Sequence, residues 1–251
     1  MSEPALGTLL GLGKEAEVFS CGAMAMKLYK PTAPKRSPFR EAAILATVES
    51  LGLPAPIVHS VRQIGDRWGL LMSRVEGPSF AEAMTHHEGT LPALLNRMAQ
   101  LQFQVHSHPA TQLASLKVRL AANIRRASML SESRQSVLLA GLAAMPHGDC
   151  LCHGDFHPHN IMGPRDSEVL IDWLDASRGE PAADVCRSYV LLRPVSAEIA
   201  SVYVDVYSQL SGRRRDAILN WLPFVAAARL AEGVPEVDDL MKMVEDTPIR
   251  S

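Results

Sequence analysis

Short apolar stretches separated by turns fill the first quarter of the chain, and this pattern is typical of antiparallel strands. Residues 8–20 hold two such stretches around a glycine-containing break, and residues 57–75 hold two more around Gly65 and Asp66. Between them, residues 23–29 (AMAMKLY) alternate strictly between two faces. Period-two alternation and tight turns predict β-hairpins. The segment 1–76 is therefore expected to form a small, strand-rich lobe.

The rest of the chain follows a helical period instead. Residues 39–52 predict a helix that ends at Gly52, and residues 91–145 look helical, with 91–107 the clearest amphipathic segment. Further helices are predicted near the end of the chain: 183–192, 197–211, 215–232 and 237–246. Glu76-Gly77-Pro78, where glycine and proline disfavour regular structure, separates the strand-rich part from the helical part. A second, mainly helical lobe is therefore expected over 77–251.

Composition narrows the class of protein. With 251 residues, 47% hydrophobic and 21% charged, the chain resembles an ordinary globular protein, and a net charge of -2 gives no reason to expect nucleic acid or an anionic membrane as partner. The 4 cysteines lack a dense spacing and are expected to be reduced thiols in a cytoplasmic protein. Neither a signal peptide nor a membrane span is expected, and no obligate protein partner is evident.

Side chains that could catalyse a reaction or bind a metal are most concentrated in CHGDFHPHNIM, residues 152–162. A turn and a short apolar run follow it, so Ile161 and Leu170 are expected to face each other in a hairpin. That register brings Asn160 beside Asp172, because facing residues on antiparallel strands lie about 5 Å apart. Two oxygen ligands suit Mg²⁺, and Asp155 upstream would lie near that cation. The layout is that of phosphoryl transfer, with one carboxylate for the attacking hydroxyl.

Other chemistries fit this loop less well. Cysteine and histidine at Cys150, Cys152, His153, His157 and His159 are the residue types of a zinc site, but no second CxxC or HxxxH completes a tetrahedral set. No serine or cysteine lies in a nucleophile elbow such as GxSxG. An ordinary polar turn explains the histidines but not the convergence of two aspartates and an asparagine on one hairpin.

HGDFHPHN followed by IDW resembles the signature of aminoglycoside phosphotransferases and of the related choline, homoserine and fructosamine kinases. The resemblance extends over most of the chain. It implies an α+β, protein-kinase-like fold with two lobes, and ATP and magnesium bound in a cleft. It also implies that Asp155 is the catalytic aspartate, that His153 braces its loop, and that Asn160 and Asp172 are metal ligands. Trp173 stands where protein kinases have the phenylalanine of DFG.

The strand-rich lobe offers the cation that such an enzyme needs for the ATP phosphates. Lys27 lies in the middle of the alternating segment, on the face opposite its methionines. Glu41 shares a helical face with Leu45 and Val48, so it is expected to point inward, where an unpaired carboxylate is costly. Lys27 is its nearest upstream partner, and the pair matches the Lys–Glu pair of the family.

Two further segments are expected to contact the nucleotide. GLGKEAEVF carries Gly11 and Gly13 where a hairpin would turn over the phosphates, although the third glycine of GxGxxG is missing. LLMSRVEG would be the hinge between the lobes, where Met72 and Arg74 would present backbone groups and apolar surface to adenine.

The acceptor is expected to bind in the helical lobe. Six acidic residues and one lysine lie in residues 231–246, so an acidic wall for a cationic acceptor is one interpretation and a solvated helix face is the other. Glu232, directly after an apolar run, and Asp175 are the candidates for acceptor binding. Asp184 is expected to cap a helix and brace the catalytic loop.

The leading hypothesis is a small-molecule kinase that transfers the γ-phosphate of ATP to a hydroxyl of an amino sugar, amino alcohol or similar metabolite. A second hypothesis keeps the fold and makes a protein side chain the acceptor. A third is a nucleotide-binding module without catalysis, which has no physical need for the loop aspartate.

Overall fold

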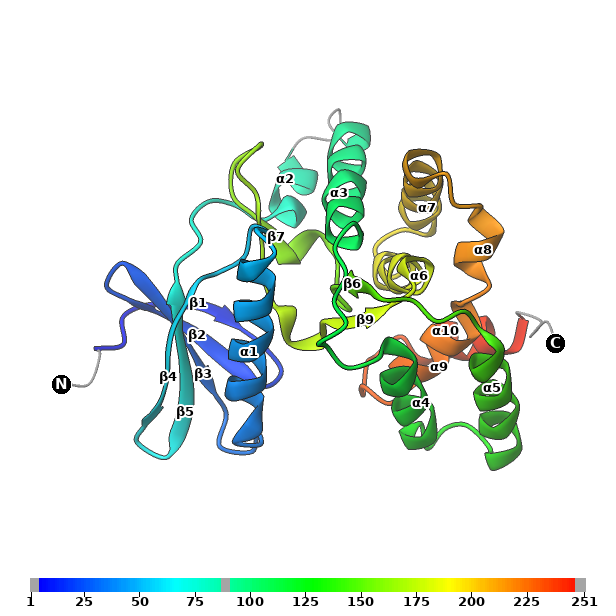
Figure 1. Ribbon diagram of the computed structural model, residues 1–251, viewed down its shortest axis with the longest axis horizontal. Coiled ribbons are helices and arrows are strands. Elements are labelled where there is room, and N and C mark those ends of the chain that lie inside the picture. The colour runs from blue at the N-terminus through cyan, green and yellow to red at the C-terminus, as the bar shows by residue number, and fades with distance from the viewer. Residues whose placement is uncertain (1–4, 87–90, 247–251) are drawn as a thin grey trace. The chain divides into compact units, whose positions relative to one another are not determined.

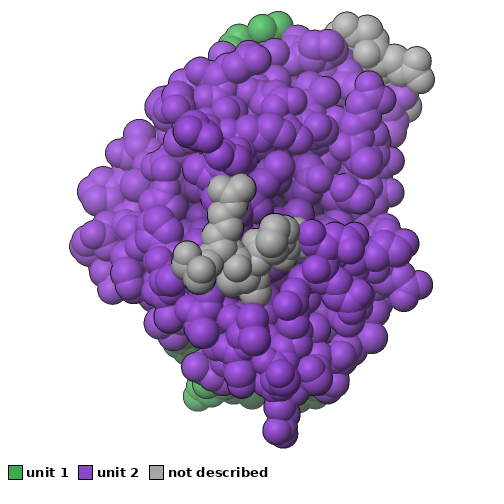
Figure 2. All heavy atoms as spheres, turned by 90° about the vertical axis from the view of Figure 1, so that its right-hand side faces the viewer, with its two compact units in different colours: residues 1–83, 159–174 green, residues 84–158, 175–251 purple. Residues whose placement is uncertain are grey.

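The computed structural model of the chain describes residues 5–86 and 91–246 (Figure 1). Contacts divide the chain into two compact units, which Figure 2 distinguishes by colour. Unit 1 comprises residues 1–83 and 159–174, and unit 2 comprises residues 84–158 and 175–251. The hairpin after the CHGDFHPHN loop thus belongs with the N-terminal strands, although it lies far from them in sequence.

Unit 1 is built on an antiparallel five-stranded sheet with the order β1-β2-β3-β5-β4. Its strands are β1 (Leu9–Leu12), β2 (Ala16–Cys21), β3 (Met24–Tyr29), β4 (Val58–Ile64) and β5 (Arg67–Ser73). The predicted hairpins are confirmed, including the turn between Ile64 and Arg67. Met26 and Leu28 pack with Leu71 on one face of the sheet, as the alternation predicts.

Helix α1 (Arg36–Ser50) lies against β4 and β5 (Figure 1). It begins three residues before the predicted start at Phe39, because a proline such as Pro38 fits the first turn of a helix, where no intrahelical N–H bond is lost. It ends as predicted before Gly52, whose φ of +72° suits glycine. Its buried stripe includes Ile44, Leu45 and Val48.

A small hairpin completes unit 1. β7 (Ile161–Met162) pairs with β8 (Val169–Leu170), and Ile161 lies opposite Leu170. The backbone N–H of Ile171 donates to Asn160 O at 3.0 Å, so the predicted register is confirmed. Two short 3₁₀ helices flank the hairpin, η2 (Pro158–Asn160) and η3 (Trp173–Asp175).

Unit 2 is mainly helical. Its helices beyond α2 (Phe80–His86), which begins in unit 1, are α3 (Leu91–His106), α4 (Leu116–Arg126), α5 (Glu132–Ala144), α6 (Pro181–Leu192), α7 (Ala197–Ser211), α8 (Arg215–Leu219), α9 (Leu222–Leu230) and α10 (Val237–Asp246). A two-stranded sheet joins β6 (Cys150–Cys152) to β9 (Ser177–Gly179). α6 packs against both α7 and α9 and is buried almost all round (Figure 1).

Two helix predictions in unit 2 are wrong in their limits. Residues 91–145 form three helices, with non-helical stretches at 107–115 and 127–131. Residues 215–232 form α8 and α9, with a break at Asn220 and Trp221. Pro223 lies in the first turn of α9, where its missing N–H is tolerated, and the same proline would interrupt a continuous helix.

The predicted fold class, mixed α+β with a small antiparallel sheet and a mainly helical part, is confirmed. Among the described helices, none combines the length and the apolar character needed to cross a lipid bilayer.

Candidate functional site

One lysine joins two carboxylates in unit 1. Lys27 Nζ donates to Glu41 Oε1 at 2.8 Å and to Asp172 Oδ1 at 2.9 Å. The Glu41 side chain is only 2% exposed, and its second oxygen accepts a hydrogen bond from the Tyr29 hydroxyl. The sheet, α1 and the small hairpin each contribute one charged group, so residues far apart in sequence form a single ion-pair cluster.

The electrostatics of this cluster hold Lys27 in its charged form. Burial lowers the pKa of Lys27, but the charges and hydrogen bonds of Glu41 and Asp172 raise it by more, so the net shift is upward. Burial and the Glu41 carboxylate both raise the pKa of Tyr29, which therefore stays a hydrogen-bond donor. Lys27 is a permanent cation beside Asp172, the more exposed of its two carboxylate partners at 48%.

Asn160 and Asp172 carry the oxygen atoms of the predicted metal site. The Asn160 side chain is buried, and its backbone is tied to the residue that precedes Asp172. Asp172 has a φ of +61°, a conformation that non-glycine residues rarely adopt and that often marks functional sites. One amide and one carboxylate fit Mg²⁺, which takes few ligands from protein and the rest from phosphate and water.

The loop that carries Asp155 is held by a buried carboxylate of unit 2. Asp184 accepts hydrogen bonds from the backbone N–H groups of His153, at 3.1 Å, and Gly154, at 2.7 Å. The Asp155 N–H donates to His153 Nδ1 at 3.3 Å, so the buried His153 also braces the loop. Gly154 has a φ of +83°, and an added Cβ would lie 2.4 Å from Asp175 O, so only glycine fits.

The Asp155 carboxylate has two cationic or polar neighbours in unit 2. His157 Nε2 lies 3.3 Å from Oδ2, and Arg187 Nη2 lies 3.6 Å from Oδ1. Burial raises the pKa of Asp155, but the hydrogen bond and charge of His157 and the charge of Arg187 lower it by more, to well below its usual range. Asp155 is therefore ionised at neutral pH and can accept a hydrogen bond from a hydroxyl.

Asp184 is the centre of a buried network rather than a helix cap. The N-cap of α6 is Glu180, so the cap prediction for Asp184 is wrong, although its role in bracing the loop is confirmed. His106 Nε2 and Gln102 Nε2 each lie 3.0 Å from Asp184 Oδ2. Burial raises the pKa of Asp184, but His106, His153 and the Gly154 N–H lower it to about 2.

This network also bears on the zinc interpretation. Ligand atoms of His106, Cys152 and Asp184 lie within 4.8 Å of one another. Hydrogen bonds already occupy both nitrogens of His106, one with Tyr207 and one with Asp184. Burial raises the pKa of the Cys152 thiol well above its usual value, which favours the thiol over the metal-binding thiolate. His106 and Asp184 are hydrogen-bonded to each other, and the Cys152 thiol donates to Cys150 O.

The residues predicted to contact the nucleotide occupy strand and turn positions in unit 1. Gly11 lies within β1, and Gly13 lies in the turn that follows, where its N–H donates to Ala16 O at 2.8 Å. Met72 lies within β5, and Arg74 follows the strand and pairs with Glu76 at 2.8 Å. Their contacts with a nucleotide stay predictions.

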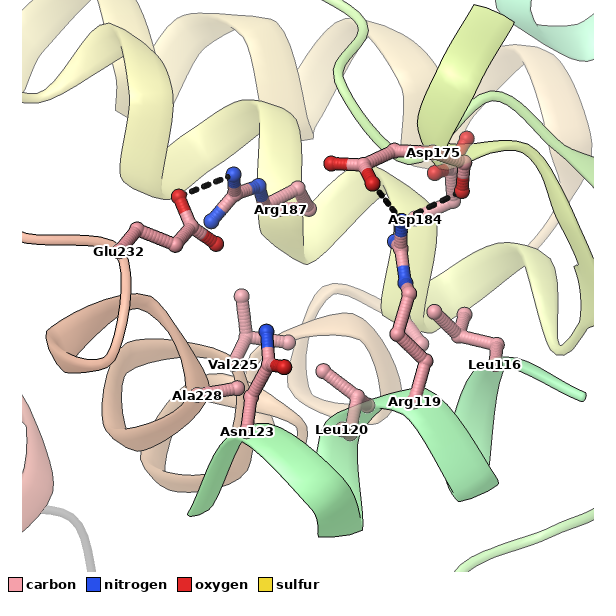
Figure 3. Close-up of a pocket in the computed structure, with 11 residues that line it drawn as sticks. Leu116, Arg119, Leu120, Asn123, Asp175, Asp184, Arg187, Val225, Ala228 and Glu232 are labelled. Carbon is pink, nitrogen blue, oxygen red and sulfur yellow. Dashed lines mark hydrogen bonds and ion pairs between the residues drawn. The ribbon is translucent and has the colours of Figure 1, made fainter. Parts of the chain in front are cut away.

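The candidates for acceptor binding both line one pocket of unit 2 (Figure 3). Arg119 Nη1 pairs with Asp175 Oδ1 at 2.9 Å. Glu232 Oε2 accepts from Arg187 at 2.8 Å and from Arg229 at 3.0 Å. Because arginines neutralise these carboxylates, Asp175 and Glu232 do not form an acidic wall.

Sequence reasoning missed Tyr29, Arg119 and Arg187 as site residues. Tyr29 had a signal, because it follows Lys27 by two residues on one face of β3. Arg187 had a weaker one, as a charge in the otherwise apolar helix α6, three residues after Asp184. Arg119 resembles any helix-surface arginine in sequence.

Comparison with known proteins identifies the class of protein. The model of the phosphotransferase enzyme family (APH) matches residues 11–219, most of the chain. The chain therefore belongs to the phosphotransferase enzyme family, which confirms the enzyme class that the motifs indicated. A search of curated proteins finds no match.

Solved structures share the protein-kinase-like fold at low sequence identity. A thermostable mutant of aminoglycoside phosphotransferase APH(4)-Ia, in complex with ADP and hygromycin B, has a TM-score of 0.69 and 15% identity over 94% of this chain and 88% of that one. An aminoglycoside-3'-phosphotransferase of type VIII has a TM-score of 0.64 and 19% identity over 92% and 94%. APH(2")-IIa, in complex with streptomycin and ATP, has a TM-score of 0.63 and 17% identity over 97% and 92%. At these identities the likeness establishes the fold.

Proposed function

We propose that the protein transfers the γ-phosphate of ATP to a hydroxyl group of a small molecule. The observation that carries this proposal is the cluster of Lys27 with Glu41 and Asp172. A cation fixed by a buried carboxylate, beside a second carboxylate on the hairpin proposed to hold Mg²⁺, is an arrangement that suits phosphoryl transfer. The ADP and ATP named with the solved structures support a nucleotide substrate.

Within this proposal, residues 1–76 bind the nucleotide and residues 77–251 supply catalysis and acceptor binding. Lys27 holds the phosphates, while Gly11, Gly13, Met72 and Arg74 contact the nucleotide. Asn160 and Asp172 hold Mg²⁺, which neutralises phosphate charge when bound.

Asp155 orients the acceptor hydroxyl and takes its proton late in the reaction. Its lowered pKa makes it a weak base, so it cannot deprotonate a free hydroxyl efficiently. It can align that hydroxyl by accepting its hydrogen bond, and it can take the proton once the oxygen has begun to bond to phosphorus. His153 and Asp184 keep the loop in place, so that catalysis comes mainly from positioning and electrostatics.

The acceptor belongs to the class of amino sugars, amino alcohols or similar metabolites. Hygromycin B and streptomycin, named with two of the solved structures, support a small-molecule acceptor. Asp175 and Glu232 line the pocket of unit 2 proposed to receive it.

The test is ADP release from ATP and magnesium in the presence of amino sugars, amino alcohols, sugars and proteins, each against a reaction without acceptor. Release that depends on a small-molecule hydroxyl is the expected result. Release that depends only on a protein would point to the side-chain kinase, and ATP binding without release would point to the non-catalytic module.

A further inference from the structure

A hollow in unit 2 opens to solvent and holds about 380 Å³ of empty space, solvent included. Side chains of α4, α6 and α9 line it, with Leu120, Val225 and Ala228 as apolar wall (Figure 3). Two ion pairs face this hollow, Arg119 with Asp175 and Arg187 with Glu232 (Figure 3). The recognition chemistry of the pocket depends on these two pairs.

Each carboxylate in the lining already has a cationic or hydrogen-bonding partner. Asp175 has Arg119, and Glu232 has both Arg187 and Arg229. Asp184 is fully buried and engaged by the catalytic loop and His106. The arginines already offset the charge of Asp175 and Glu232, so an ammonium group on a ligand would gain less from these carboxylates than from unpaired ones. The pocket therefore favours a polycation less than an unneutralised acidic wall would.

Hydrogen-bond donors, in contrast, are in excess. Among the described residues, Arg187 bonds through Nη2 alone, and its Nε is buried with no partner. Arg119 likewise uses only Nη1, for the backbone oxygen and the carboxylate of Asp175. A guanidinium carries five N–H donors in a planar fork that matches a carboxylate. Both arginines retain donors for a ligand rich in acceptor oxygens.

Both arginines also lie next to the Asp155 loop. Arg187 Nη2 is 3.6 Å from Asp155 Oδ1. A Cβ added to Gly154, the residue before Asp155, would lie 2.7 Å from Arg119 Nη2. A group bound by these guanidinium groups would therefore place its neighbouring hydroxyl close to Asp155.

We propose that the acceptor is a small hydroxylated molecule that carries a carboxylate, and that Arg119 and Arg187 bind this carboxylate and so determine specificity. The inference rests on the proposed function, because it concerns the acceptor of that reaction. It narrows the acceptor class to members that carry a carboxylate, and it predicts that polycationic aminoglycosides are not the preferred acceptors.

Matched pairs of acceptors in which a carboxylate replaces a hydroxymethyl group or a hydrogen atom test this proposal. Glycerol with D-glycerate, glucose with glucuronate, and ethanolamine with serine form three pairs, and kanamycin represents the polycations. ADP release gives KM and kcat for each compound, and calorimetry in the presence of ADP gives binding independently of turnover. For at least one pair we expect the carboxylate member to bind at least about 10-fold more tightly, as a charge-assisted hydrogen bond predicts.

Three variants test whether the two pocket arginines cause the preference for the carboxylate. Arg119→Gln removes one guanidinium, and Arg187→Lys keeps the charge but removes the fork. Each is expected to reduce the preference for the carboxylate about 10-fold, mainly through KM. Arg125→Gln is the matched control, because it removes an exposed positive charge from the same helix, outside the pocket lining. It should leave the preference unchanged.

The outcomes separate this inference from the function on which it rests. If no carboxylate binds better than its neutral twin, including the case in which none binds, or if kanamycin is preferred, the inference is wrong. If Arg125→Gln reduces the preference as much as the two pocket variants, general surface charge explains it and the inference is also wrong. A protein that binds no ATP and releases no ADP with any acceptor contradicts the proposed function itself.

Discussion

The ion-pair clusters of the two units differ in how their cations are shared among the carboxylates. In unit 1 a single cation, Lys27, faces two carboxylates, and Asp172 remains half exposed. In unit 2 the pocket carboxylates Asp175 and Glu232 are each matched by at least one arginine. A lysine shared by two carboxylates leaves negative charge that attracts a cation such as Mg²⁺, whereas arginines with unused N–H donors attract an acceptor-rich ligand. The partners of the acidic residues, rather than their count, indicate what each region binds.

Replacing the catalytic candidate should give the largest effect. Asp155→Ala removes the carboxylate that orients the hydroxyl, so turnover should fall by about 10² to 10⁴-fold. The Kd for ATP should stay unchanged, because the proposed nucleotide contacts lie in other residues. Steady-state kinetics and calorimetry on one preparation measure both. Turnover at the parental rate with a true acceptor would show that the role is misassigned.

The buried carboxylate of unit 1 should matter mainly for stability. Glu41→Gln leaves Lys27 and Tyr29 facing a neutral amide, and breaking such a buried pair should lower the free energy of unfolding by about 3 kcal/mol. Glu49→Gln, exposed on the same helix, is the control and should change stability by less than about 0.5 kcal/mol. Denaturant unfolding compares them, and equal effects would mean that Glu41 is not an essential partner.

The exposed carboxylate of the same cluster, Asp172, should matter for binding Mg²⁺ rather than for stability. Asp172→Asn should weaken magnesium-dependent nucleotide binding by about 10-fold, or about 1.4 kcal/mol. Asp166→Asn is a close control, since Asp166 lies in the turn of the same hairpin and also has a positive φ, of 69°. Asparagine tolerates this conformation, so both variants keep the backbone. Unchanged binding in Asp172→Asn by calorimetry would exclude its role as a ligand.

The smallest effect on acceptor binding and stability is expected from a substitution on α10. The side chain of Asp239 is 59% exposed and lies 3.9 Å from Lys242, as in a solvated helix face. Asp239→Asn should leave the acceptor KM unchanged and stability within about 0.5 kcal/mol. A clear rise in KM would restore the acidic-wall interpretation of residues 231–246.

Local patterns were enough to predict much of unit 1. Alternation in β3 placed Lys27 opposite the methionines, and the helical stripe of α1 placed Glu41 inward. The apolar runs after the loop gave the register of Ile161 and Leu170. These predictions succeeded because each depends on one element or on two neighbouring strands.

The pocket of unit 2 could not be predicted from such local patterns. Arg119 and Glu232 come from segments more than a hundred residues apart, and only the packing of α4, α6 and α9 brings them to one hollow. The pairing of Glu232 with Arg187 depends on the same packing. An acidic segment in sequence therefore allowed a cationic ligand as one interpretation, because Arg187 lies 45 residues before Glu232, although Arg229 lies only three residues before it.

Phosphorus NMR of the reaction mixture tests the central claim most directly. With ATP, magnesium and the acceptors described above, the γ-phosphate signal of ATP should decline as a new phosphomonoester signal grows in equal amount. Release of inorganic phosphate alone, or no change with any acceptor, would contradict the assignment of this chain as a phosphotransferase acting on a small-molecule hydroxyl.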